Sequence, residues 1–420
     1  MPGFKRNSRA RRRIAVKVTP KAIKRIIATT IPLIIICIVS LGLKYHQSNL
    51  QIENNKQEAK QEAYKVFQDE DYSQIEGEKY ETKDDIINIV AVGNIICNSK
   101  FCESIYDEQS DSYLFLKFAD KIRQYVEIAD YTIAPFKSNF VDTYQEEKGK
   151  MRVPKDLGLA LKNLGIDLLT TAHNNSYDYG KEGIEQTIDY LESLGIKQVG
   201  LNKTKEEKEQ VNIVEIRGIK VAFLAYTDKT NVNTKESYSV NKMEKKQIIA
   251  DVQKAKEKGA EVIFVCLNWG DSNAEKPTQS QQELAKTLAD NGVDVIIGSN
   301  PKLVGKIENY QNKDGKNTCI VYSIGNFLDL GEKEEKIEIA LDIEITKTAE
   351  DGQVHLSKIS YTPMYLLDKG EAEKERYCLV DVKQEIERYR AEVQNNLTQE
   401  DYNNIQNSLT DLEKRIKGEK

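Results

Sequence analysis

Ten residues that could bind an ion or a small anionic group follow short apolar runs of the sequence. Five are asparagines and two are lysines, joined by one histidine, one aspartate and one tryptophan. Lysine holds carboxylates and phosphates by charge-assisted hydrogen bonds, and asparagine adds neutral donors and acceptors. Such residues could form a site for an anionic group, and the candidates are Asn94, Lys137, His173, Asn174, Asn175, Asp178, Asn268, Trp269, Asn300 and Lys302.

An ordinary structural role is open for each of these residue types. Lysine is most often a solvated loop residue. Asparagine after a strand often caps a turn through local hydrogen bonds. Trp269 could line a pocket or simply pack, and His173 beside Ser176 is a weak pair for nucleophilic catalysis. The sequence alone leaves the binding and the structural interpretation open.

Alternating strands and helices must position these residues. Six short apolar runs predict buried strands, and four amphipathic stretches predict helices between them. Ligands of such α/β sheets gather at the loops beyond the carboxyl ends of the strands, where most of the candidates lie. The strands are predicted at 86–92, 131–134, 166–171, 262–267, 295–297 and 318–323, and the helices at 113–127, 156–164, 184–194 and 279–291.

The second half of the sequence departs from a purely parallel pattern. Residues 211–226 predict a β-hairpin that turns at Arg217 and Gly218. The runs 336–346 and 354–361 alternate between apolar and polar residues, which predicts edge or surface strands. The expected fold class is therefore α/β with mixed strand pairing.

The N-terminal region predicts a membrane anchor. Residues 1–25 hold ten lysines and arginines and no carboxylate, and residues 26–43 carry no charge. Eighteen helical residues span about 27 Å, close to the roughly 30 Å of a bilayer's hydrocarbon core. Because the basic cluster precedes the apolar segment, we expect a single transmembrane helix in the cell membrane, a cytoplasmic N-terminus and an extracellular main domain. A cleaved signal peptide is the alternative, although no small-x-small cleavage site follows Leu43.

The remaining chain divides into a polar stalk at 44–85, a folded ectodomain at 86–383 and a polar helical C-terminal tail at 384–420. After Lys44 the chain holds 50 basic and 67 acidic residues, a net charge of −17. This balance argues against nucleic-acid binding outside the membrane. The six cysteines contain no C-x-x-C spacing and predict no disulfide framework.

The order of the motifs at the predicted strand ends resembles one known family. The motifs are Ala91–Ile96, Thr171–Gly180, Leu267–Gly270, Ile297–Lys302, Tyr322–Phe327 and Tyr361-Thr362-Pro363. With these motifs in this order, the chain resembles the CapA-type poly-γ-glutamate capsule synthesis family, whose domain is similar to calcineurin-like metallophosphoesterases. The resemblance implies a layered αββα fold and a membrane-anchored component of capsule polymer synthesis or export. It also implies partners among other capsule synthesis or export subunits, and an anionic polymer.

Most positions where this family has metal ligands are substituted. The Gly-Asp motif is Gly93-Asn94, and Lys137 stands where the family has the glutamate of Asn-Leu-Glu. The His-Trp-Gly motif begins with Asn268, and the Gly-His-His-Pro-His motif has lost all three histidines between Gly298 and Lys302. In the Asn-Asn-His motif only Asn174 matches in register.

The substitutions predict the loss of metal-dependent catalysis. A two-metal hydrolase needs carboxylates and neutral imidazoles around its cations, whereas an ammonium group repels them. We therefore expect a non-catalytic domain without metal or other cofactor, in which Lys137 and Lys302 supply positive charge for an anionic ligand. The alternative is a metal-dependent hydrolase of an envelope amide or phosphoester, with His173 and Asp178 as surviving ligands.

Overall fold

The computed structural model describes residues 84–97, 99–141, 150–330, 336–370, 376–393 and 397–419. Residues 82–420 form one compact unit. The predicted basic tail and membrane segment, and nearly all of the predicted stalk, lie outside the described residues. Within the described part of the chain, no helix is both long and apolar enough to cross a membrane.

The first of two large sheets carries the N-terminal parallel strands of the domain. β1, β5, β6 and β7 pair in parallel in that order, and β15 joins β1 on its other side antiparallel. The sheet order is β17-β16-β15-β1-β5-β6-β7. Its strands are β1 Asp85–Val92, β5 Tyr131–Pro135, β6 Leu168–Thr170, β7 Lys197–Val199, β15 Ile337–Lys347, β16 Val354–Asp368 and β17 Tyr377–Asp381.

The second sheet has six strands in the order β12-β13-β11-β10-β9-β8. Its four inner strands are parallel, and the two edge strands β8 and β12 are antiparallel to their neighbours. The predicted hairpin is confirmed, since Arg217 and Gly218 both have positive φ angles, as a two-residue turn of this kind requires. The strands are β8 Asn212–Ile216, β9 Ile219–Thr227, β10 Val262–Asn268, β11 Val295–Ser299, β12 Ile307–Gln311 and β13 Asn317–Val321.

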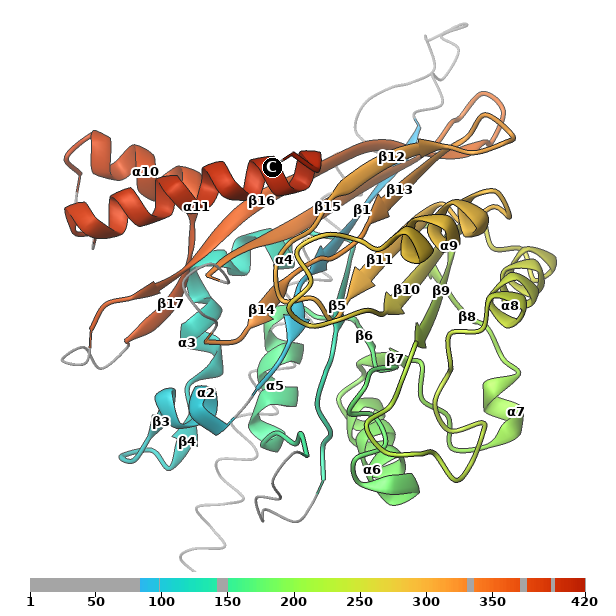
Figure 1. The fold of residues 1–420 in the computed structure, drawn as a ribbon, viewed down its shortest axis with the longest axis horizontal. Helices are drawn as coiled ribbons and strands as arrows, with labels where there is room; N and C mark the ends of the chain where they lie inside the picture. The colour runs from blue at the N-terminus through green and yellow to red at the C-terminus, as the bar shows by residue number, and fades with distance from the viewer. Residues whose placement is uncertain are drawn as a thin grey trace, which may run out of the picture. The chain divides into compact units, whose positions relative to one another are not determined.

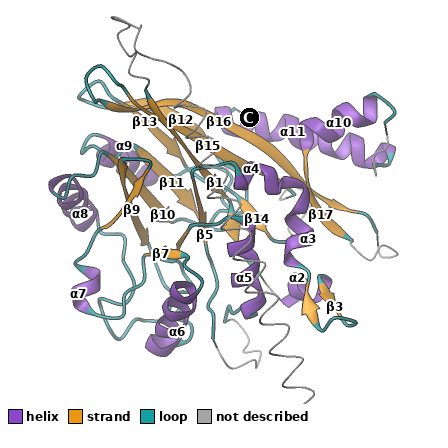
Figure 2. Cartoon of the chain, turned by 180° about the vertical axis from the view of Figure 1, so that it is seen from behind, coloured by secondary structure: helices purple, strands orange, loops and turns teal. Residues whose placement is uncertain are grey.

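Alternating side chains along the strands divide the core into three layers. In β1, Ile87 and Ile89 face a core shared with the second sheet, while Val90 and Val92 face helices on the outer side. In β10, residues 262, 264 and 266 face that shared core, and 263, 265 and 267 face α8 and α9. The two sheets therefore pack face to face between helices, which is the predicted αββα arrangement (Figures 1 and 2).

The helices cover the outer faces and the ends of these sheets. α3 and α5 pack on the outer face of the first sheet, and α8 and α9 on that of the second. The helices are α2 Ser99–Ser104, α3 Phe115–Ala119, η2 Asp120–Ile122, α4 Arg123–Glu127, α5 Lys155–Leu164, α6 Gly180–Ser193, α7 Lys205–Lys208, α8 Lys245–Glu257, α9 Gln279–Ala289, α10 Val382–Arg390 and α11 Gln399–Lys417, and the short strands are β2 Asn94–Ile95, β3 Tyr106–Asp107, β4 Ser112–Tyr113 and β14 Asn326–Leu328.

Two predictions about the outer elements were wrong, and a third holds in part. β16 is not an edge strand, since it lies between β15 and β17, but none of its residues 354–361 is buried, as expected of a surface strand. β15 is neither an edge nor a surface strand, because it lies between β16 and β1 and most of its residues are buried. The alternation that suggested a surface strand includes Glu338, which is 1% exposed. The predicted helix 113–127 is interrupted by a 3₁₀ turn at Asp120–Ile122.

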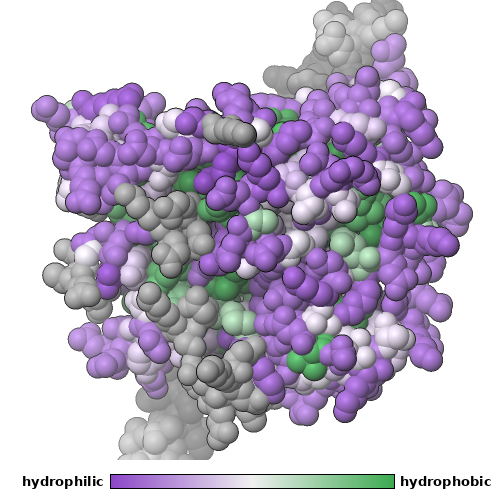
Figure 3. Space-filling view, in the orientation of Figure 1, coloured by the Kyte–Doolittle hydropathy of each residue, from purple (hydrophilic) through white to green (hydrophobic). Residues whose placement is uncertain are grey.

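The predicted C-terminal tail is part of the folded body. α10 and α11 form there, but Ile405 and Leu412 of α11 are fully buried in the core between the sheets. No boundary at residue 383 separates a second compact unit. The face shown in Figure 3 is largely hydrophilic, with apolar residues in small separate patches.

Candidate functional site

The candidate residues lie where strands of both sheets end. Asn94 lies in β2, after β1, and Lys137 follows β5, while Asn268 ends β10 and Asn300 follows β11. Because these strands are parallel within each sheet, their carboxyl ends lie on one side of it. β2 also pairs with β14, which brings Asn94 beside Asn326. We call Asn94, Lys137, His173, Asn268 and Asn300 the strand-end cluster.

Asn94 joins the loops of the two sheets through its side chain. Its Nδ2 atom donates to the Gly325 carbonyl at 2.7 Å and lies 3.2 Å from Asn326 Oδ1. Its Oδ1 atom accepts from the Asn300 backbone N–H at 3.4 Å. The residue before it must be glycine, because a Cβ atom at Gly93 would lie 2.4 Å from the Asn326 carbonyl oxygen. Asn94 thus has a structural role, because its buried side chain holds the loop at 325–326 next to the loop that begins at Asn300.

Lys137 brings an ammonium group into the interior of the strand-end cluster. The residue is 5% exposed, and its Nζ donates to Asn300 Oδ1 at 2.5 Å. Burial lowers the pKa of Lys137 to about 7, with Asp228 opposing the shift and Lys229 adding to it. The solvated-loop interpretation is therefore wrong for Lys137. Asn300 connects Lys137 to the loop after β10, since its Nδ2 donates to the Gly270 carbonyl at 2.8 Å.

Lys302 differs from Lys137 in its surroundings. It is only partly buried, and its backbone N–H donates to the Ser272 carbonyl at 2.9 Å. The two lysines that the sequence grouped together are therefore not equivalent. Only Lys137 donates to the amide of Asn300 within the described residues.

His173 faces the same interior as a neutral ring. It is 2% exposed, and its Nδ1 accepts from the Asn175 backbone N–H at 3.1 Å, which leaves the ring proton on Nε2. Burial and the positive charge of Lys137 hold the pKa of His173 well below its ordinary value, although the Ser138 backbone opposes the shift. The imidazole of His173 is therefore neutral at physiological pH.

Asp178 is directed toward its own loop. Its Oδ2 accepts from Asn175 Nδ2 and from the Met151 backbone N–H, both at 2.9 Å. Asn174 continues this chain of contacts by donating from Nδ2 to Asn175 Oδ1 at 3.0 Å. Burial raises the pKa of Asp178, and these hydrogen bonds oppose the rise. The residue organises the turn after β6.

Asn268 and Trp269 have different roles although they are adjacent. Asn268 is 3% exposed, and its Oδ1 accepts from Thr227 Oγ1 at 3.2 Å. Its Nδ2 has no hydrogen-bond partner within the described residues. Trp269 donates from Nε1 to the Tyr322 carbonyl at 3.0 Å and stacks on the Tyr322 ring. Trp269 is 1% exposed and is therefore a core residue.

Sequence reasoning missed two charged residues beside the cluster. Asp228 and Lys229 follow β9, and both act electrostatically on Lys137. Asp228 Oδ2 also accepts from the Gly270 backbone N–H at 2.8 Å. The available signal was their position directly after the apolar strand 219–226, the same rule that identified the other candidates.

The donor set does not fit a metal centre. Within the described ranges, no group of three or more His, Cys, Asp or Glu side chains could hold a metal ion. Neutral amides and a buried ammonium are the groups that converge, and Asp178 is engaged by Asn175 and Met151. Amides are weak ligands and a lysine ammonium repels cations, so the arrangement disfavours divalent metal.

Comparison with known proteins identifies the family. A family model described as "Bacterial capsule synthesis protein PGA_cap" matches residues 88–330, more than half of the chain. The chain belongs to this family. The matched range contains the whole strand-end cluster.

Two relatives carry capsule names. The chain is 27% identical over 259 residues to the "PGA biosynthesis protein CapA" of Bacillus subtilis, covering 58% of this chain and 64% of the relative. It is 26% identical over 256 residues to the "Capsule biosynthesis protein CapA" of Bacillus anthracis, covering 58% and 59%. The chain thus spans about three fifths of the length of these relatives.

Solved structures with a similar arrangement include phosphoesterases. The calcineurin-like phosphoesterase YfkN of Bacillus subtilis has a TM-score of 0.42 and 14% identity, covering 79% of this chain and 98% of that one. The NAD nucleotidase NadN of Haemophilus influenzae has a TM-score of 0.44 and 11% identity, covering 80% and 57%.

Proposed function

We propose that this chain is a membrane-anchored, non-catalytic component of capsule polymer synthesis or export. Its N-terminus lies in the cytoplasm and residues 86–420 lie outside the cell membrane. The family and the CapA relatives support the role in capsule synthesis. The basic residues 1–25 and the uncharged segment 26–43 support the anchor. Other capsule subunits and an anionic polymer are the proposed partners, and nucleic acid is not among them.

The buried Lys137 ammonium carries the non-catalytic part of the proposal. A hydrolase of the metallophosphoesterase type relies on divalent cations to polarise its substrate and to activate water. Here the Lys137 side chain donates to Asn300 in the interior of the cluster, so a lysine of the chain occupies a ligand position of the family. Lysine offers positive charge but no metal-bound water for attack.

Genetic complementation with one conservative variant tests the proposal. A capsule-producing bacterium whose own copy is deleted receives either the wild-type chain or Asp178→Asn, with expression checked by immunoblot. We expect the deletion to lose capsule and both chains to restore it, because an asparagine oxygen can still accept from Asn175 and Met151. Loss of capsule with well-expressed Asp178→Asn would favour a hydrolase that needs this carboxylate. Unchanged capsule in the deletion strain would contradict the capsule role itself.

A further inference from the structure

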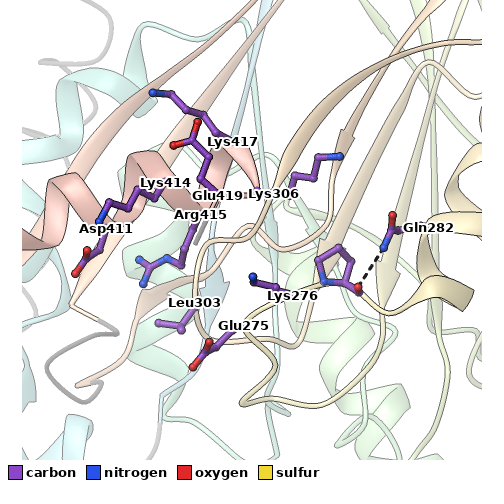
Figure 4. Close-up of a pocket in the computed structure, with 12 residues that line it drawn as sticks. Glu275, Lys276, Gln282, Leu303, Lys306, Asp411, Lys414, Arg415, Lys417 and Glu419 are labelled. Atoms are coloured by element: carbon purple, nitrogen blue, oxygen red, sulfur yellow. Dashed lines mark hydrogen bonds between the residues drawn. The ribbon is translucent and has the colours of Figure 1, made fainter.

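A second site lies between the end of α11 and two loops of the second sheet. A cavity of about 710 Å³ is bounded by the last turn of α11, by residues 275–277 before α9 and by the loop that contains Leu303 and Lys306. Figure 4 shows side chains from α11 and from the loop before α9 around this space. Its basic lining residues are Lys276, Lys306, Lys414, Arg415 and Lys417.

Positive charge prevails in this cavity although the chain after Lys44 is acidic. The five basic side chains face three carboxylates, Glu275, Asp411 and Glu419. The chain after Lys44 has a net charge of −17, so the sign of the charge in the cavity is opposite to that of the chain around it. A local excess of positive charge creates a positive potential that attracts anions.

Three of these lysines have unused ammonium groups. Lys306 pairs with Glu308 at 2.9 Å, whereas Lys276, Lys414 and Lys417 form no ion pair within the described residues. Ammonium groups without an ion-pair partner stay available to a ligand, and the carboxylates of a bound anion would each add an ion pair.

The helix end alone does not explain this arrangement. Basic residues in the last turn of a helix complement its dipole, which accounts for Lys414 and Lys417. Lys276 belongs to a different segment, some 140 residues earlier in the sequence, and lines the cavity from the opposite side. The buried residues Ile405 and Leu412 fix α11 on the core, so its basic turn is held in place.

We propose that this cavity binds a carboxylate-bearing segment of an anionic polymer. The inference rests on the proposed capsule function, and it adds the place where the polymer is held. A volume of about 710 Å³ lies within the range of small-ligand sites and suits a few residues of a chain that continues into solvent. Several carboxylates in a row match several separate ammonium groups better than one compact anion does, because each contact adds an ion pair.

The cavity is connected to the strand-end cluster by a short stretch of chain. Asn300 accepts from Lys137, and Leu303, three residues later, lines the cavity. The Lys302 backbone N–H donates to Ser272, which joins this loop to the one that leads to Lys276. The buried cluster thus helps to fix the loops that carry Lys276 and Lys306.

A charge-reversal variant of the full chain tests the site. Binding of fluorescently labelled poly-glutamate is measured by anisotropy for the wild type and for Lys276→Glu/Lys414→Glu/Lys417→Glu. We expect at least a tenfold rise in Kd for this triple variant. Free glutamate and inorganic phosphate serve as competitors, and we expect both to displace the polymer only at far higher concentrations, because each makes fewer ion pairs.

A matched control separates the cavity from net charge. Lys205→Glu/Lys245→Glu/Lys246→Glu changes the charge by the same amount at exposed residues of α7 and α8, away from the cavity. We expect a change in Kd of less than threefold.

An equal loss of polymer binding in both triple variants, or no polymer binding by the wild type, would overturn the site. Tight displacement by phosphate alone would overturn the polymer as its ligand. None of these results bears on capsule loss in the deletion strain, so the two proposals fail separately.

Discussion

The strand-end cluster and the cavity beside α11 both contain lysine, but they treat its charge in opposite ways. Lys137 is 5% exposed and donates to Asn300, whereas Lys276, Lys414 and Lys417 line an open cavity and form no ion pair within the described residues. A buried ammonium is costly, so it persists only with fixed partners. Exposed ammonium groups cost little and stay available for a ligand. The comparison assigns a structural role to the first site and a binding role to the second.

The largest effect should follow removal of the Lys137 side chain. Lys137→Ala leaves a cavity and deprives Asn300 Oδ1 of its donor. We expect a loss of about 2–4 kcal/mol in the free energy of unfolding, measured by urea denaturation. Lys137→Met fills the space without a charge and should cost less. A change below about 0.5 kcal/mol in Lys137→Ala would contradict the structural role.

The pH dependence of stability should report the same buried group. Burial lowers the folded-state pKa of Lys137 to about 7 from the ordinary 10.5. The unfolded chain therefore binds more protons between these values, so this group makes stability rise with pH, by at most about 1.4 kcal/mol per pH unit. Urea denaturation at pH 7 and pH 9 should show a smaller rise in Lys137→Met than in the wild type. An equal rise in both proteins would show that Lys137 is not titrating there.

A buried carboxyl group offers a smaller test of the same principle. Glu338 is 1% exposed, and burial together with the negative charge of Asp329 raises its pKa well above the ordinary value. A raised folded-state pKa gives stability at low pH that is lost as the pH rises. We expect Glu338→Gln to stabilise the chain by about 1–2 kcal/mol at pH 8, and by less at pH 5, in urea denaturation. Destabilisation at pH 8 would indicate that the charge has a partner.

The smallest effect on stability should come from the cavity lysines. Lys276, Lys414 and Lys417 are solvent-accessible and unpaired within the described residues, so their reversal to glutamate removes no packing. For Lys276→Glu we expect a change within about 0.5 kcal/mol in the free energy of unfolding, measured by urea denaturation alongside the polymer assay. Lys414→Glu and Lys417→Glu should each cost up to about 1 kcal/mol, because they place a negative charge at the C-terminal end of α11. A large loss would mean that these side chains support the fold and that their binding role is secondary.

The central strands could be predicted because both of their faces are buried. β1, β9 and β10 are nearly continuous apolar runs, and their predicted bounds differ from the observed ones by one residue. β15 was misplaced because the charged residues in its sequence suggested a solvent-facing side. Position within a sheet depends on pairing between distant segments, and β15 pairs with a strand some 250 residues earlier.

The site was predictable in its location but not in its energetics. The rule that ligands gather at strand ends located Asn94, Lys137 and Asn300 correctly. Nothing in the sequence distinguished Lys137 from Lys302, because burial arises from loops that follow β5, β9, β10 and β11. The sequence left the role of Trp269 open between pocket lining and packing for the same reason, since its partner Tyr322 lies 53 residues away.

Metal analysis of the full chain tests the central claim most directly. The protein is purified without chelators, exposed to Mn and Zn, freed of excess ions, and measured by mass spectrometry beside Asp178→Asn. We predict metal at background in both proteins, because Lys137 and neutral amides fill the strand-end cluster. One or two ions per wild-type chain, reduced in Asp178→Asn, would contradict the account and establish a working metal site.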